Sequence, residues 1–244
     1  MLCYCLSAIA QIKGNGQLVS KSFDVTDLTE LEISLYAKIE IDCSSEPFME
    51  ISAEENIIEQ IKTDIDEGRL NIDQKQWVSP SQPIVIKFGA PNLTRIQQNT
   101  HETAIVKSID SREFSAMAIV GEIVLNGKVE QLNASGEIGT IKAKELVADE
   151  VNVNLWDDGI IYLGNPSKIS GIVKSEGQVL YSGNDTKITA SARKGAKISN
   201  YNAAPADPRS EEGPHYFIKF KIKNNSGNRI NCYVVGPKNN GKKF

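Results

Sequence analysis

Cysteine is scarce in this sequence, with four residues among 244. That number is too small for a disulfide scaffold, and a chain of this length can bury a core without such links. Histidine is rarer still, since only His101 and His215 occur. Neither lies at metal-site spacing from Cys, Asp or Glu residues, so we expect no resident metal and no cofactor.

Long apolar runs and catalytic motifs are also missing. No stretch approaches the ~20 apolar residues of a membrane-spanning helix. No serine lies in a Gly-x-Ser-x-Gly motif and no phosphate-binding P-loop occurs, so we expect no enzyme activity. Seven of the 27 basic residues and none of the 31 acidic ones fall in 215–244, so the rest carries a net charge of −11. An acidic body argues against nucleic-acid binding.

Strand-forming residues are abundant instead, and they recur with a regular period. Glycines at 121, 139, 159 and 177 are each followed by alternating apolar residues, at spacings of 18, 20 and 18. The residue two positions after each glycine is apolar, and Ala104 has the same place after Glu102 one period earlier. These five residues are Ala104, Ile123, Ile141, Ile161 and Val179. A second apolar column precedes the glycines: Phe114, Leu132, Val151, Ile169 and Ile188. Gly195 continues the spacing, with Lys197 and Ser199 in the inward positions.

This pattern predicts a mainly all-β fold, a β-helix or solenoid of about six coils between 92 and 201. At ~3.3 Å per residue, 18 residues trace ~60 Å, a circuit of three short sides, and coils stack ~4.8 Å apart. Glycine would supply corners where φ turns positive. Lys197 and Ser199 then indicate a capping coil. The alternative is an antiparallel sandwich with strands every 8–12 residues, which the regular glycine spacing disfavours.

The segment 14–90 predicts an N-terminal strand–helix–strand cap. Leu31, Ile33 and Leu35 alternate like a strand, and so do the residues around Ile39 and Ile84. Four isoleucines between Glu54 and Gly68 follow helical spacing, which predicts a helix of about three turns ended by that glycine: Ile57, Ile58, Ile61 and Ile65.

The first ten residues, MLCYCLSAIA, predict the remnant of a signal peptide, with Ala8-Ile-Ala10 as the cleavage pattern. The alternatives are a lipoprotein modified at Cys5, which the bulky Tyr4 disfavours, and an ordinary buried strand. Export would leave Cys43 and Cys232 in an oxidising compartment. They could pair, but each also fits an inward strand position, and we expect them unpaired.

The C-terminal part divides into a linker at 205–214 and a basic hairpin at 215–244. Alternation around Phe220, the turn Asn224-Asn-Ser-Gly-Asn228 and alternation around Cys232 indicate two strands. The lysines suggest either a solvated face or contact with an anionic partner. Because a lone hairpin is marginal in water, we expect it to pack on the body, on a partner, or on chain beyond Phe244.

One set of polar residues is a candidate site. Four carboxylates fall just before the glycines of successive coils: Glu137, Asp157, Asp158 and Glu176. Stacked so closely they could hold calcium, which takes six to eight oxygens, or supply a glycosidase carboxylate pair. Simple exposure to solvent at a corner is the alternative. Trp156 and Tyr162 could form a sugar-stacking platform, although Trp156 also fits a half-buried corner.

Several short motifs occur in an order that resembles a known family. They are Gly14-Asn-Gly16, Phe23-Asp-Val25, Gly68-Arg-Leu-Asn-Ile72, Pro91-Asn-Leu93 and Gly159-Ile-Ile-Tyr-Leu-Gly-Asn-Pro166. In this respect the chain resembles the putative auto-transporter adhesin, head GIN domain family, over roughly 16–200. The resemblance implies a right-handed β-helix domain at 14–201 in an exported envelope protein of a Bacteroidetes-type bacterium, with no catalytic residues.

We therefore expect a non-enzymatic envelope or surface module with an adhesin-like or scaffold role, in the periplasm, at the outer surface or outside the cell. An envelope glycan or a surface protein would be its partner. A carbohydrate-active enzyme using the corner acids and a glycan-binding module using Trp156 and Tyr162 are the alternatives.

Overall fold

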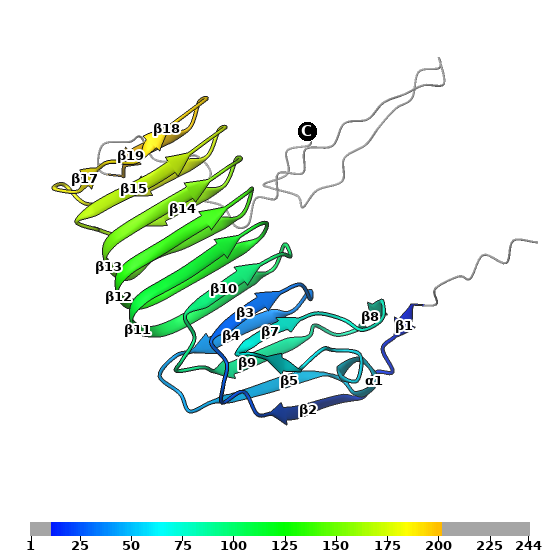
Figure 1. The fold of residues 1–244 in the computed structure, drawn as a ribbon. Coiled ribbons are helices and arrows are strands. Elements are labelled where there is room, and N and C mark those ends of the chain that lie inside the picture. The colour runs from blue at the N-terminus through cyan, green and yellow to red at the C-terminus, as the bar shows by residue number, and fades with distance from the viewer. Residues whose placement is uncertain (1–10, 202–244) are drawn as a thin grey trace, which may run out of the picture. The chain divides into compact units, whose positions relative to one another are not determined.

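Parallel strands stacked one coil upon the next form most of the chain (Figure 1). The computed structural model describes residues 11–201. Within them the solenoid has about six turns. The predicted leader at 1–10, the linker at 205–214, the hairpin at 215–244 and Cys232 lie outside the described residues. Mainly β architecture and the solenoid are confirmed.

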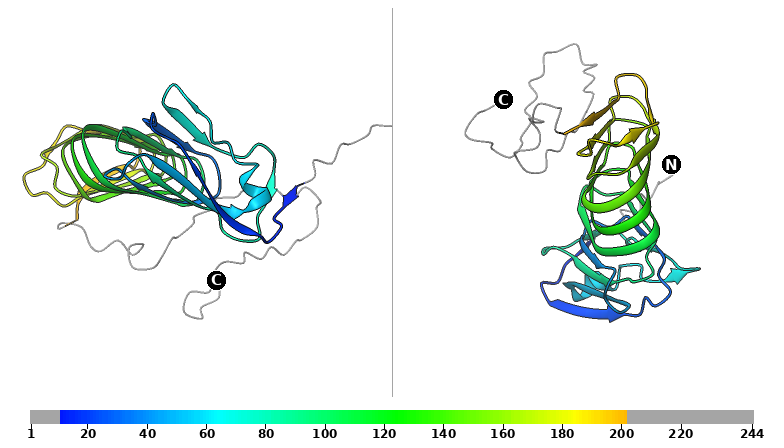
Figure 2. Two further views of the ribbon diagram at one scale, coloured as in Figure 1. Left: turned by 90° about the horizontal axis from the view of Figure 1, so that it is seen from below. Right: turned by 90° about the vertical axis from the view of Figure 1, so that its left-hand side faces the viewer.

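Three long bent strands form the middle of the solenoid, and shorter strands continue it toward residue 201. The long strands are β11 (Thr103–Ala118), β12 (Glu122–Gly136) and β13 (Thr140–Leu155). The others are β14 (Ile160–Leu163), β15 (Lys168–Val173), β16 (Gln178–Tyr181), β17 (Lys187–Ile188), β18 (Ser191–Ala192) and β19 (Lys197–Asn200). Figure 2 shows these coils stacked in one column.

Each long strand turns two corners without leaving its ladder. The register shifts near Val106 and near Val124, where neighbouring coils differ by one residue. Further along, two consecutive exposed residues interrupt the alternation of buried and exposed positions at 112–113, 130–131 and 149–150. With the turn between coils, these corners give the circuit three short sides. The coils differ in length by one residue, and the extra residue lies at a corner. The inward columns therefore stay in register.

The predicted internal columns are confirmed. Ala104 pairs with Ile123, and the ladder continues through Ile141 and Ile161 to Val179, all in parallel register. Each of these five side chains is at most 1% exposed. In the second column, Phe114, Leu132, Val151 and Ile169 are likewise buried, whereas Ile188 in the last described coil is 38% exposed. Like side chains stacked on like therefore fill the interior.

The last coil departs from the prediction by one residue. Val179 pairs with Ile198, and Tyr181 pairs with Asn200. The turn before β19 is one residue longer than the glycine spacing implies, so Lys197 and Ser199 point outward and Ile198 takes the inward position. The predicted inward placement of Lys197 and Ser199, which led to the capping interpretation, is wrong.

The repeated glycines are required mostly for close approach of the coils. Gly121 has a positive φ of 68° and Gly195 of 96°, but Gly139, Gly159 and Gly177 have none. A Cβ at Gly139 would lie 2.7 Å from both the Cβ and the carbonyl oxygen of Ala118 in the coil below. The expectation of a positive φ at every corner is thus wrong, because most of these positions need the absence of a side chain rather than unusual dihedrals.

The N-terminal strands interleave with the solenoid. β3 (Glu30–Ile33) lies between β7 (Arg69–Ile72) and β10 (Arg95–Gln98), and Figure 1 shows these three side by side. β4 (Lys38–Asp42) lies between β9 (Val85–Gly89) and β11. The layer formed by residues 30–42 is thus inserted between layers that come later in the sequence. Part of the segment predicted as a cap extends the parallel stacks.

Antiparallel strands close this end. β5 (Phe48–Glu54) pairs with β9 and with β2 (Leu18–Phe23), while β1 (Ile12–Lys13) pairs in parallel with β8 (Val78–Ser79). The buried carboxylate of Glu54 fastens two loops to β5. It accepts hydrogen bonds from the backbone N–H of Gly16 at 2.7 Å and from the backbone N–H and hydroxyl of Ser81 at 2.8 Å each.

The predicted three-turn helix is wrong. The helix α1 (Glu55–Ile58) is a single turn, and Ile65 belongs to β6 (Ile65–Asp66), which pairs antiparallel with β7. Glu67 and Gly68, with φ of 46° and 80°, form the two-residue hairpin loop, a geometry that favours glycine. Strand pairing with β7 therefore overrides the helical spacing. No helix within 11–201 is long and apolar enough to span a membrane.

Candidate binding face

One side of the solenoid presents outward side chains in straight columns, and we call it the ladder face. It is formed by β10, the second half of β11, β12 and β13, and β15, which pair in register. Because inward positions hold the core, the alternate residues point outward. Its first column is Arg95, Ser115, Asn133, Asn152 and Ser170, and its second is Gln97, Met117, Ser135, Asn154 and Ile172.

Apart from Met117 and Ile172, the columns from β11 to β15 consist of uncharged amides and hydroxyls. The Asn133 Nδ2 donates to Glu113 Oε1 at 2.6 Å, and the Gln131 Nε2 donates to Asn133 Oδ1 at 3.2 Å. Asn152 and Asn154 are exposed, and their side-chain amides make no hydrogen bond with the part of the chain that the structure describes. Each amide offers two N–H donors and one acceptor oxygen, so this surface can bond to groups that both donate and accept.

Several charged residues around these columns form pairs of opposite sign, whereas Arg95 has no ion pair within 11–201. Arg69 Nε lies 3.2 Å from Glu30 Oε2, and Lys168 Nζ lies 3.0 Å from Glu150 Oε2. Arg112 and Glu130, 3.4 Å apart, form a further pair at the neighbouring corner. Such exposed pairs contribute little stability, but they cancel the local field over the face. The ladder face therefore has little net charge, although the molecule as a whole is acidic.

A shallow hollow of about 180 Å³ lies at the end of the ladder face formed by β3, β7 and β10. Its polar lining comes from six positions on these adjacent strands: Glu30, Glu32, Arg69, Asn71, Arg95 and Gln97. Gln97, which also lines it, belongs to the second ladder column, so the hollow is continuous with the polar columns.

The four predicted corner carboxylates occupy different positions of the turn. The backbone N–H of Trp156 donates to the carbonyl of Gly136, which aligns Trp156, and not an acid, with Glu137. Lys174 follows Trp156 in the same ladder, because its N–H donates to the carbonyl of Leu155. Asp157, Asp158 and Glu176 lie one or two positions further along their turns. No group of three or more His, Cys, Asp or Glu within 11–201 is arranged to hold a metal ion.

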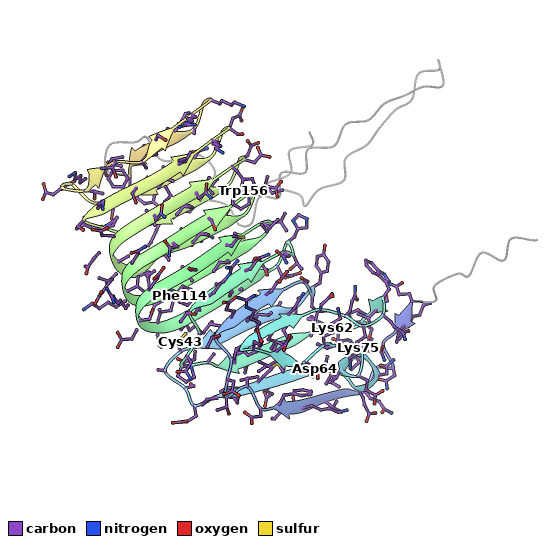
Figure 3. All side chains as sticks on the ribbon, viewed as in Figure 1. Cys43, Lys62, Asp64, Lys75, Phe114 and Trp156 are labelled. Atoms are coloured by element: carbon purple, nitrogen blue, oxygen red, sulfur yellow. The ribbon has the colours of Figure 1, made fainter. Side chains whose placement is uncertain are left out.

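Trp156 and Tyr162 lie on separate elements. Trp156 is half-buried in the turn between β13 and β14, at the turn side of the coils in Figure 3. Tyr162 points outward from β14 and stacks on Tyr201, with ring centroids 6.0 Å apart and an interplanar angle of 15°. Lys144 Nζ lies 5.0 Å and 4.3 Å from the two centroids. Trp156 and Tyr162 thus belong to a turn and to a strand, respectively, and the ring stacked on Tyr162 is Tyr201.

Perturbed ionisable groups have local explanations. Asp24 and Asp42 have a lowered pKa because Thr26 and Ser44, respectively, hydrogen-bond their carboxylates. Asp24 borders an acidic hollow of about 540 Å³ together with Asp27, Asp64 and Glu67. Burial raises the pKa of the Cys43 thiol to about 11, with a smaller contribution from the charge of Asp42. Cys43 forms no disulfide within 11–201, and the expectation that it is not paired with Cys232 stays a prediction because Cys232 lies outside the described residues.

Sequence reasoning missed the ladder face as a site. Its columns are the outward counterparts of the apolar columns that defined the repeat, so the signal was present in the alternate positions. The period alone places Ser115, Asn133 and Asn152 on one outer column. Attention to the turns led instead to four acids, which occupy different positions of successive turns.

The fold and this face together define a parallel β-solenoid module with a flat polar surface. The family described as "Putative auto-transporter adhesin, head GIN domain" matches residues 27–184, and the chain belongs to this family. No curated protein matches the chain.

Among solved structures, a putative adhesin from Bacteroides fragilis NCTC 9343 is 17% identical, with a TM-score of 0.64, over 78% of this chain and 99% of that chain. A putative lipid binding protein from Parabacteroides distasonis is 17% identical, with a TM-score of 0.48, over 78% and 99%. A putative adhesin from Parabacteroides merdae is 16% identical, with a TM-score of 0.45, over 78% and 98%. At these identities the first likeness shows the fold alone.

Proposed function

We propose that this chain is a non-enzymatic, adhesin-like module of the cell envelope that holds an extended partner on the ladder face. The observation that carries the proposal is the unbroken register of polar columns across β10, β11, β12, β13 and β15. Stacked repeats of this kind create long surfaces suited to partners that span several coils. Membership of an adhesin-described family supports a surface location, and the apolar residues 1–10 support export.

Location is tested in the producing bacterium. Intact cells are treated with a membrane-impermeant amine-reactive label and then fractionated, and the mature N-terminus of the chain is sequenced. We expect labelled protein in the envelope or medium, beginning near Gln11. Recovery of the protein solely as unlabelled material in the cytosolic fraction would contradict an envelope role.

Adhesion is tested with beads that carry the full chain. Replacing Asn152 and Asn154 by arginine adds bulk and charge to the ladder face at two exposed positions, so bead attachment to the bacterium's own surface should fall at least tenfold. Gln178→Arg, on the outward side of β16, serves as the matched control and should leave attachment unchanged. Equal attachment of all three proteins would exclude the ladder face.

The non-enzymatic assignment has its own test. The full chain is incubated with a panel of polysaccharides, and new reducing ends are measured. We expect none above background. Cleavage that disappears in an Asp157→Asn, Asp158→Asn double variant would instead make the corner carboxylates catalytic.

A further inference from the structure

We infer that the occupant of the ladder face is an uncharged glycan chain lying along the solenoid axis. This inference rests on the proposed binding role of the same face and specifies the chemistry of the partner. It depends on four properties of the face, namely its hydrogen-bonding groups, its charge, its apolar content and its shape.

The hydrogen-bonding groups match hydroxyls. The two central columns hold three asparagines, one glutamine and three serines: Asn133, Asn152, Asn154, Gln97, Ser115, Ser135 and Ser170. Carboxamides and hydroxyls both donate and accept, as sugar hydroxyls do. Some capacity is already used, because the hydroxyls of Ser135 and Ser170 lie 3.5 Å from carbonyl oxygens of the coil below. The exposed amides of Asn152 and Asn154 keep theirs.

The charge of the face argues against a polyanion. Nucleic acids and acidic polymers are attracted by clustered lysines and arginines and bind less tightly as salt rises. On the ladder face, Arg69 is paired with Glu30 and Lys168 with Glu150. Arg95 is then the one column residue with a charge, which is too little positive charge to hold an acidic polymer, and a neutral partner fits the face better.

The apolar content argues against a protein partner. Cores of protein interfaces are rich in aromatic and apolar residues, which supply most of the binding free energy. The two central columns contain only Met117 and Ile172 as apolar members, and no aromatic residue. A protein docked on this face would bury amides and hydroxyls without an apolar centre.

The shape favours a polymer over a small molecule. Small-molecule sites are concave and mostly apolar, whereas the columns follow the pleat of a parallel sheet, with a repeat of ~4.8 Å along the axis. A chain laid along that axis meets at least one amide or hydroxyl side chain at each coil. At the hollow, the guanidinium of Arg95 adds five N–H donors without requiring a charged ligand.

Native gel electrophoresis through gels that contain a polysaccharide tests the inference on the full chain. The probes are hydroxyethylcellulose, dextran and yeast mannan as neutral polymers, with polygalacturonate as the acidic one. We expect retardation by at least one neutral polymer and an affinity that changes less than twofold between 50 and 500 mM NaCl, because an uncharged polymer forms no ion pair that salt could screen. An Asn152→Ala, Asn154→Ala variant should bind that polymer at least tenfold more weakly.

Matched controls keep the result interpretable. Gln178→Ala, on another side of the solenoid, should bind like the unchanged chain, and thermal unfolding should show both variants folded. Retardation by polygalacturonate alone, by none of the polymers, or equally in the ladder variant would overturn the inference. If beads nevertheless attach through the ladder face, the proposed adhesin role survives and a protein partner replaces the glycan. If bead attachment also proves independent of Asn152 and Asn154, both the proposed adhesin role of the ladder face and the glycan inference fail.

Discussion

At the scale of single residues, Glu54 and Gly139 show how local chemistry determines the end and the corners of the solenoid. The buried Glu54 carboxylate stabilises the loops around Gly16 and Ser81, and a Cβ at Gly14 would collide with it. Hydrogen bonds lower the pKa of Glu54, chiefly the one from the backbone N–H of Ser81, against a burial effect that raises it. Gly139, in turn, permits two coils to approach where a side chain would clash.

Glu54→Gln tests the buried carboxylate. Because its pKa is lower in the folded state, ionised Glu54 stabilises the fold above its unfolded pKa of about 4.3, and this contribution is lost as pH falls through the folded pKa. We expect the variant to be less stable at pH 7 and to lose less stability on acidification below about pH 4.3 than the parent. Urea unfolding at several pH values measures both effects, with the exposed Glu55→Gln as control. Parallel pH profiles for Glu54→Gln and the parent would rule out this role.

Gly139→Ala tests close coil approach. The new methyl group would lie 2.7 Å from Ala118, so one coil must shift, and we expect a loss of about 1–3 kcal/mol in unfolding free energy. Glu102 occupies the equivalent position two coils earlier, and Glu102→Ala should change stability by less than about 0.5 kcal/mol. Denaturant unfolding measures both variants. An unchanged midpoint for Gly139→Ala would show that the corner can move to accommodate a methyl group without loss of stability.

At the scale of elements, strand pairing decides conformations that local sequence leaves open. The isoleucines after Glu54 satisfy a helical pattern, yet Ile65 pairs with Leu70 in a hairpin because β7 is already held in the stack by β3. The long strands likewise keep their columns through corners of unequal length. The inward column, rather than any single strand, is thus the stabilising unit.

Ile141→Ala tests that unit. Ile141 lies between Ile123 and Ile161 in the ladder and is 1% exposed, so the truncation leaves a cavity bounded by both neighbours. We expect a loss of about 2–5 kcal/mol in unfolding free energy. The neighbouring Lys142 points outward, and Lys142→Ala should cost about 1 kcal/mol or less, since only an exposed ion pair with Glu122 is lost. Comparable losses in the two variants would contradict an inward Ile141.

At the scale of the whole molecule, the interleaved N-terminal layer ties early residues to late ones. β3 and β4 precede their partners in the chain, but each is hydrogen-bonded on both sides: β3 to β7 and β10, and β4 to β9 and β11. The layers around them can close only after residues 69–107 have arrived. Such long-range pairing makes this end of the solenoid a cooperative unit rather than a detachable cap.

Native-state hydrogen exchange tests the interleaving. Amides of β3 and β4 should exchange as slowly as those of β11, because opening them requires separating strands on both sides. Amides of β2, which pairs only with β5 within 11–201 and is largely exposed, should exchange faster. Exchange of β3 at the rate of β2 would place residues 30–42 at an edge instead.

By itself the sequence determined the solenoid, because a coil repeat must put the same kind of side chain inward at each lap, and Ile123, Ile141 and Ile161 record that requirement directly. It also carried the family resemblance. Only the tertiary structure decided the one-residue shift at Ile198, the hairpin at Ile65 and the insertion of residues 30–42 between later layers, because each depends on which distant strand offers its backbone for pairing. The polar ladder belongs to both: its residues follow the sequence period, but its flatness and its matched charges come from the stacking of coils.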